Sequence, residues 1–224
     1  MKIELKHVSK TIRNQPVAQD ICAELESGRI YGFQGINGSG KTMLMRLICG
    51  LIRPTEGEIL IDGKRLGKDL TFPDSVGLFL ENPAFLDRYS GMQNLKMLAS
   101  IENNIGDAEV EAALRAVGLD PSDRKKYRKY SLGMKQRLGI AAAVMEQPEL
   151  VILDEPTNSL DADGVQLVKG ILAQQKARGA LVIISCHDLA VLQEMSDEIL
   201  LLEAGRVKAH LYAPAFSQPA REVL

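Results

Sequence analysis

The stretch Gly35-Ile36-Asn37-Gly38-Ser39-Gly40-Lys41-Thr42 decides the fold. It matches G-x-x-x-x-G-K-[ST], the pattern of a phosphate-binding loop (P-loop). An apolar run at 30–33 leads into it and a helical pattern at 43–49 follows, as this loop requires. Glycines let backbone N–H groups curl around phosphate oxygens, and the helix N-terminus adds a partial positive charge. We expect Lys41 to reach the β- and γ-phosphates and the Thr42 hydroxyl to ligate Mg²⁺.

Two carboxylates follow another apolar run. Residues 150–153 read Leu-Val-Ile-Leu, which is typical of a strand buried on both faces, and Asp154 and Glu155 come directly after. Open α/β sheets bind ligands beyond the carboxyl ends of their strands, so these side chains belong near the phosphate-binding loop. Asp154 suits a Mg²⁺ ligand, directly or through water, and Glu155 is placed to polarise an attacking water. The two motifs together indicate a P-loop nucleotide hydrolase.

Strand and helix patterns alternate along the chain. Strands are predicted at 3–8, 17–25, 30–33, 57–62, 76–80, 150–153, 181–185 and 198–202, with helices at 43–49, 164–178 and 189–195. Residues 83–145 carry apolar side chains at helical spacing instead. We therefore predict an α/β fold: a P-loop core with a mixed, largely parallel sheet, an antiparallel β-subdomain and an inserted helical subdomain. The core takes 1–82 and 146–211, the helical subdomain 83–145, and 212–224 is expected to be a poorly ordered tail.

Composition excludes several classes of protein. The 224 residues carry a formal net charge of -2, which gives no indication of nucleic-acid binding by bulk charge. The longest uncharged apolar stretches, at 140–144 and 180–186, are far shorter than the roughly 20 residues that cross a bilayer. We expect no membrane span, so this chain could act at a membrane only by docking onto another protein.

The three cysteines predict no site. Cys22, Cys49 and Cys186 have spacings that fit neither a disulfide framework nor a zinc site. Each lies among apolar residues, so each is expected to be a small buried hydrophobe, which suits a reducing compartment.

The segment Tyr130-Ser131-Leu132-Gly133-Met134-Lys135-Gln136-Arg137 narrows the class. It resembles the signature sequence of ABC ATPases, whose commonest form is L-S-G-G-Q. Ser131 and Gly133 match that form, whereas Tyr130, Leu132 and Met134 depart from it. A serine hydroxyl and a glycine N–H at a helix N-terminus form an anion site. The resemblance covers nearly the whole chain, from Ile3 to about Val207.

Three further motifs follow in the order of this family. Asn158-Ser159-Leu160-Asp161 looks like the D-loop, and His187 looks like the switch histidine that contacts the γ-phosphate and the attacking water. Glu81-Asn82-Pro83 falls where the family has its Q-loop, whose glutamine senses Mg²⁺ and the γ-phosphate and links to the membrane domain. Glu81 replaces that glutamine. A carboxylate still ligates Mg²⁺ but adds negative charge near phosphate, so a change in turnover or coupling is expected.

A second departure concerns the base. The family often stacks an aromatic side chain on adenine near the end of the first strand, where this chain has Ile12. Ile12 offers packing without a π-face, which favours loose base selectivity.

The resemblance implies a complete set of site residues. The catalytic candidates are Glu155, His187 and Glu81, and the Mg²⁺ ligands are Thr42, Asp154 and Glu81. The ATP-binding candidates are Ile12, Gly35, Asn37, Gly38, Ser39, Gly40, Lys41, Thr42, Ser131, Gly133, Met134 and Asp161.

The resemblance also implies partners. ATP would lie between the loop 35–42 of one copy and residues 131–134 of a second copy or a related subunit, in a head-to-tail dimer. A separate membrane permease would carry the cargo and dock near 83–99, which places the chain in the cytoplasm at the inner face of the cell membrane. The 130–134 form resembles that of bacterial single-domain exporters of peptides or antibiotics, which favours export.

Alternative functions stay open on the sequence. Soluble ABC ATPases of translation or DNA repair usually have tandem domains or a long coiled-coil insertion, and this chain has neither. A nucleotide-responsive regulator that scarcely hydrolyses ATP is kept open by Glu81. A P-loop kinase is disfavoured by the 130–137 segment and His187.

Overall fold

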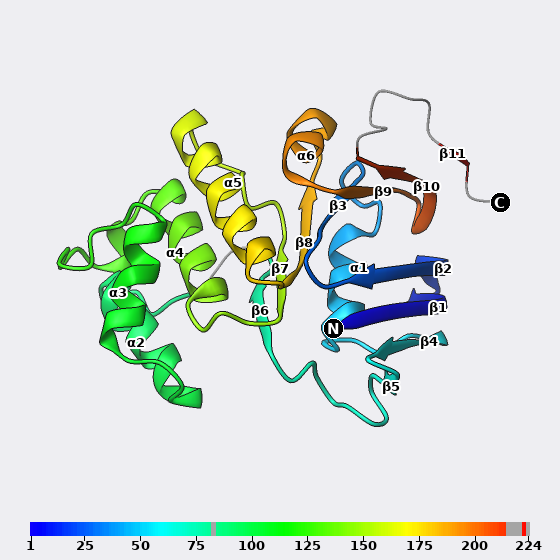
Figure 1. Ribbon diagram of the computed structural model, residues 1–224, viewed down its shortest axis with the longest axis horizontal. Helices are drawn as coiled ribbons and strands as arrows, with labels where there is room; N and C mark the ends of the chain where they lie inside the picture. The colour runs from blue at the N-terminus through cyan, green and yellow to red at the C-terminus, as the bar shows by residue number, and fades with distance from the viewer. Residues whose placement is uncertain (82–83, 214–220, 223–224) are drawn as a thin grey trace.

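The computed structural model describes residues 1–81, 84–213 and 221–222. It contains two sheets with helices between and around them (Figure 1). The predicted fold class is confirmed: the chain is a mixed α/β protein with one largely parallel sheet and one antiparallel sheet. Within the described ranges no helix is both long and apolar enough to span a membrane.

The larger sheet has the strand order β11-β10-β9-β3-β8-β7-β6. Its parallel part comprises β3 (Ile30–Gln34), β6 (Val76–Phe79), β7 (Leu150–Leu153), β8 (Leu181–Cys186) and β9 (Glu198–Glu203). β10 (Arg206–Tyr212) and β11 (Arg221–Glu222) extend it antiparallel. β3, β7 and β8 therefore end side by side at one edge, where ligands bind in open α/β sheets.

The smaller sheet is antiparallel, with the order β2-β1-β4-β5. It comprises β1 (Lys2–Ile12), β2 (Gln15–Glu26), β4 (Glu56–Ile61) and β5 (Lys64–Arg65). Helix α1 (Lys41–Ile48) lies between the two sheets (Figure 1), and its Leu44 and Leu47 are fully buried. One apolar cluster joins the helix to both sheets, through Ile3 and Leu5 on one side and Phe33 on the other. This packing fixes the start of α1, and with it the phosphate-binding loop.

The other face of the parallel sheet packs on helices. α2 (Gly91–Glu102), α3 (Asp107–Ala116) and α4 (Leu132–Val144) gather on the side away from the antiparallel sheet (Figure 1). α5 (Ala162–Ala177) and α6 (Leu189–Met195) follow them in the chain. β7 contributes to both cores, because Leu150 and Ile152 join the cluster around α1 while Val151 and Leu153 join the helical cluster. A continuous apolar run thus has both faces covered, as the sequence predicts.

Three features differ from expectation. The strand patterns missed β5 and β10, because β5 is two residues long and β10 alternates with charged side chains. Residues 212–224 are not simply a tail: Tyr212 closes β10, and Arg221 and Glu222 pair with β10 as β11, while 214–220 and 223–224 lie outside the described residues. Cys49 and Cys186 are buried as expected, but Cys22 is exposed. Its neighbour Ile21 faces the core, and strand alternation turns Cys22 the other way.

Candidate functional site

The phosphate-binding loop connects β3 to α1. Gly38 and Gly40 have φ values of 82° and 106°, in the left-handed region that glycine adopts without strain. A Cβ atom at Gly40 would lie 2.7 Å from the carbonyl oxygen of Val17, so a side chain there would also collide with β2. Glycine is therefore required at Gly40 for two reasons. The loop ends at Lys41, the first residue of α1, where free backbone N–H groups favour an anion.

Lys41 is held inside the loop. Its side chain is only 6% exposed, and Nζ donates a hydrogen bond to the Gly35 carbonyl oxygen at 2.6 Å. The Ser39 hydroxyl is buried beside it and has no hydrogen-bond partner among the described residues. A buried cation and an unpaired buried hydroxyl at a helix N-terminus fit a phosphate group, whose oxygens would satisfy both.

Asp154 joins the loop to the end of β7. The Thr42 hydroxyl donates to one carboxylate oxygen of Asp154 at 2.6 Å, and the Ser185 hydroxyl donates to the other. Asp154 is buried, so these two hydrogen bonds stabilise its charge. A hydroxyl and a carboxylate at hydrogen-bond distance are oxygen ligands of the type that Mg²⁺ prefers, and both residues are among the predicted ligands.

Glu155 is held by its backbone as well as its side chain. Its φ of 49° is left-handed, which is uncommon outside glycine. The Glu155 N–H donates to the Ser185 hydroxyl at 2.8 Å, and the Glu155 carbonyl accepts from the Gln136 side-chain amide at 2.8 Å. The carboxylate oxygens lie 3.6 Å from Lys41 Nζ and 3.2 Å from His187 Nδ1. Glu155 is thus fixed between two cationic or basic groups, in a geometry that suits a general base.

Ser185 and Gln136 are functional candidates that sequence reasoning missed. Ser185 is fully buried and touches both acidic residues, and Gln136 connects α4 to Glu155. The signal was their position: Ser185 stands two residues before His187 at the end of a predicted strand, and Gln136 lies inside the 130–137 segment. Next to Ser185, burial raises the pKa of the Cys186 thiol, which keeps it protonated at neutral pH.

A cavity of about 520 Å³ opens beside the loop. Its lining combines most of the loop with both acidic residues, and includes Asn37, Gly38, Ser39, Gly40, Lys41, Thr42, Asp154 and Glu155. Gln15, Pro16 and Val17 of β2 line it too, whereas the described lining does not include Ile12, which ends β1 across the hairpin turn. The start of β2 thus forms part of the wall of this cavity.

A second cavity, of about 690 Å³, lies at the start of α4. It is lined by the predicted Ser131, Gly133, Met134 and Asp161, among others. The Ser131 hydroxyl caps α4 by accepting from the Met134 N–H at 3.2 Å, and a Cβ at Gly133 would approach the Ser159 carbonyl to 3.1 Å. The described residues that line this cavity are all different from those that line the first. Most of the predicted residues therefore fall into two separate sets, whereas Ile12, Gly35, Glu81 and His187 line neither cavity among the described residues.

Tyr130 explains one departure from the commonest signature form. Its ring is buried, and its hydroxyl accepts a hydrogen bond from the Gly91 N–H at 3.1 Å, at the start of α2. A Cβ at Gly91 would lie 2.6 Å from that hydroxyl, so glycine makes room for it. Burial raises the pKa of the Tyr130 phenol. Tyr130 thus ties the start of α4 to α2.

Glu81 pairs with α1. Its carboxylate lies 2.6 Å from Nη2 of Arg46, one helical turn beyond Thr42. Glu81 also has a left-handed φ, of 58°. Asn82 and Pro83, the other two residues of the predicted Q-loop, lie outside the described residues, as does the first residue of the predicted docking region.

Comparison with known proteins identifies the family. Residues 18–158 match the family model described as ABC transporter. The chain belongs to the ABC transporter ATP-binding family. The predicted class is thereby confirmed, an ATP-binding, ATP-hydrolysing subunit of an ABC transporter.

Relatives of known name agree with this ABC assignment. An uncharacterised ABC transporter ATP-binding protein of Bacillus subtilis, YybJ, is 45% identical over 92% of this chain and 94% of its own length. The bacitracin transport ATP-binding protein BcrA of Enterococcus faecalis is 37% identical over 92% of this chain and 67% of its own. A solved ATP-binding subunit of an ABC transporter superposes with a TM-score of 0.84 at 30% identity, covering 95% of this chain and 90% of that one.

Proposed function

We propose that this ABC subunit powers the export of a peptide antibiotic through a separate membrane permease, by binding and hydrolysing ATP between two copies of the chain. The cargo class rests on the similarity to the bacitracin transport protein BcrA. The observation that carries the mechanism is the division of the site residues into two sets around two cavities. A single copy holds two different halves, so a complete site needs two copies arranged head to tail.

Most of the predicted site residues have a role in this proposal. The loop residues Gly35, Asn37, Gly38, Ser39 and Gly40, with Lys41, bind the phosphates, and Lys41 balances charge that develops on the γ-phosphate. Thr42 and Asp154 would hold Mg²⁺, which supplies further charge compensation when bound. Glu155 draws a proton from the attacking water, and His187 orients that water and the γ-phosphate. Ser131, Gly133, Met134 and Asp161 close the site from the second copy.

The helical face supports a permease partner. Large apolar side chains are exposed in the predicted docking region 83–99, at Leu86, Tyr89, Met97 and Leu98, and just beyond it at Ile101. Groups of exposed apolar side chains are typical of surfaces that bind another protein. A permease docked on this face would hold the subunit at the cytoplasmic side of the membrane. α2 and α4 lie close together, and the Tyr130–Gly91 hydrogen bond connects this face to the signature segment.

ATP-driven dimerisation tests the shared site. We expect Glu155→Gln to run as a monomer without nucleotide and as a dimer with Mg²⁺ and ATP in size-exclusion chromatography, because bound ATP is not turned over. Adding Lys41→Ala should abolish that dimer, and adding Ser131→Arg should also abolish it while leaving ATP binding to the monomer intact. A dimer that survives Ser131→Arg would contradict the head-to-tail arrangement.

A further inference from the structure

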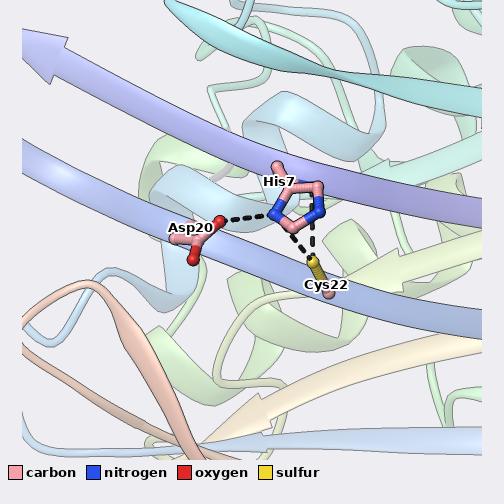
Figure 2. Close-up of side chains that lie close together, drawn as sticks. All are labelled: His7, Asp20 and Cys22. Carbon is pink, nitrogen blue, oxygen red and sulfur yellow. Dashed lines mark hydrogen bonds and ion pairs between the residues drawn. The ribbon is translucent and has the colours of Figure 1, made fainter.

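Three potential metal ligands meet on the outer face of the antiparallel sheet. His7 of β1 and Asp20 and Cys22 of β2 place one ligand atom each within 4.8 Å of the others (Figure 2). His7 Nδ1 lies 2.8 Å from an Asp20 carboxylate oxygen and 3.6 Å from the Cys22 sulfur. Figure 2 shows the Asp20 carboxylate and the Cys22 sulfur directed toward the same imidazole ring. Neither the nucleotide site nor the signature cavity involves these residues.

Two irregularities in strand pairing build this cluster. The β1–β2 register shifts between Leu5 and Val8 and again between Val8 and Lys10. His7 and Asp20 occupy the irregular positions, with left-handed φ values of 51° and 50°. β-bulges re-aim side chains that a regular ladder would send elsewhere. The Val8–Ile21 pair between them is buried, which anchors the sheet while the outer face carries the polar groups.

Backbone groups fix two of the three ligands. The His7 N–H donates to the Cys22 sulfur at 3.3 Å, which orients that sulfur. The Asp20 N–H donates to the Ser9 hydroxyl at 3.0 Å. The nearby Glu4 and Glu24 are each paired with a lysine, so Asp20 is the carboxylate that faces the imidazole. The Cys22 sulfur thus has a contact of the kind that orients a metal ligand, and the backbone of Asp20 is held in place beside it.

We propose that His7, Asp20 and Cys22 form a binding site for a zinc-type divalent transition metal. Imidazole nitrogen, carboxylate oxygen and thiolate sulfur are the ligands of protein zinc sites. Bond lengths of zinc in a tetrahedron place a nitrogen and a sulfur ligand about 3.6 Å apart, which the His7–Cys22 distance matches. A nitrogen and an oxygen ligand would stand about 3.3 Å apart, so Asp20 needs to retreat by only about 0.5 Å.

The exposure of the cluster sets its coordination. The His7 and Asp20 side chains are 78% and 64% exposed, and Cys22 is exposed too. The fourth position therefore faces solvent, where water completes the tetrahedron. Mg²⁺ and Ca²⁺ prefer oxygen ligands, so the site discriminates against the metal of the nucleotide site. The proposal stands independently of the export function.

Cobalt is a suitable probe because a thiolate–Co²⁺ bond gives a charge-transfer absorption band. We would titrate the tag-free, reduced full chain with Co²⁺, follow that band, and then displace Co²⁺ with Zn²⁺. One Co²⁺ per chain is expected at saturation. Cys22→Ser should abolish the band, and His7→Asn and Asp20→Asn should weaken binding at least about tenfold. Asparagine tolerates the left-handed backbone at both positions, so these variants keep the fold, which circular dichroism would check.

Cys186→Ala is the matched control. Cys186 forms the other candidate group, with Glu155 and His187, so a band from that group would disappear in this variant. The proposal expects the band to persist in Cys186→Ala and to vanish in Cys22→Ser. It is overturned if the wild-type chain gives no saturable thiolate band, or if the band follows Cys186 instead of Cys22.

Discussion

His187 Nδ1 lies 3.2 Å from one carboxylate oxygen of Glu155, while Lys41 Nζ lies 3.6 Å from the other. The three residues come from the ends of β8 and β7 and from the start of α1. Parallel strands that end at one edge, next to a loop–helix junction, account for this convergence. This convergence places the Glu155 carboxylate between a lysine and a histidine side chain, the position in which the proposed mechanism needs it.

Glu155→Gln removes the proposed proton acceptor and keeps the shape of the side chain. We expect ATP hydrolysis to fall at least about 100-fold, the usual contribution of a general base, with little change in ATP affinity. Phosphate release measures the first and equilibrium binding of a fluorescent ATP analogue the second. Retention of more than about a tenth of wild-type hydrolysis would remove Glu155 from the role of base.

Ser185→Ala tests the buried hydroxyl that joins the two acidic residues. The change leaves an Asp154 oxygen and the Glu155 N–H without a partner, which costs about 1–3 kcal/mol in the free energy of unfolding. We also expect a higher Mg²⁺ requirement for hydrolysis, because Asp154 loses its orientation. Ser185→Thr keeps a hydroxyl and serves as the control for hydrogen bonding. Chemical denaturation and Mg²⁺-dependent turnover report the two effects separately.

Local patterns explain why so much of this molecule could be predicted from its sequence. The loop 35–42 and the buried run 150–153 can each be recognised from a few consecutive residues, because the pattern itself determines the local structure. The structure brings the loop together with Asp154 and Glu155, which follow the run. What could not be predicted depends on how elements distant in the sequence pack on one another. Gln136 reaches Glu155 only because α4 lies against the end of β7, and no spacing in the chain encodes that contact.

The prediction of buried cysteines holds for Cys49 and Cys186 and is wrong for Cys22, for a related reason. Cys22 was expected to be buried because its neighbours are apolar, but strand alternation faces Ile21 inward and Cys22 outward. The cluster with His7 and Asp20 then depends on two register shifts, which hydrophobic pattern does not predict. Spacing rules for zinc sites assume that the ligands lie within short local motifs. The proposed ligands His7, Asp20 and Cys22 lie on two paired strands and meet where the strand register shifts.

Gln136→Ala tests the hydrogen bond between the signature helix and Glu155. The Gln136 amide holds the Glu155 carbonyl at 2.8 Å, so its loss frees a backbone that is already in a left-handed conformation. We expect turnover to fall about tenfold with little change in the KM for ATP, because the proposed function assigns ATP binding in the ground state to the loop 35–42. Gln136→Glu keeps the length of the side chain but removes the donor, and should behave like alanine. A change in KM alone would indicate a different role.

The Arg46–Glu81 ion pair involves a residue that departs from the family pattern, because Glu81 stands where the family has a glutamine. The positive charge of Arg46 neutralises the carboxylate of Glu81. The pair therefore adds no net negative charge one helical turn from Thr42. Arg46→Ala should expose that charge and raise the KM for Mg-ATP by roughly two- to fivefold, more at low salt because nearby charges are less screened. Glu81→Gln in the same chain should restore the KM, whereas Glu81→Gln alone should change it little. Steady-state kinetics of the four proteins form a double-mutant cycle, and additive effects would mean that the two side chains do not act as a pair.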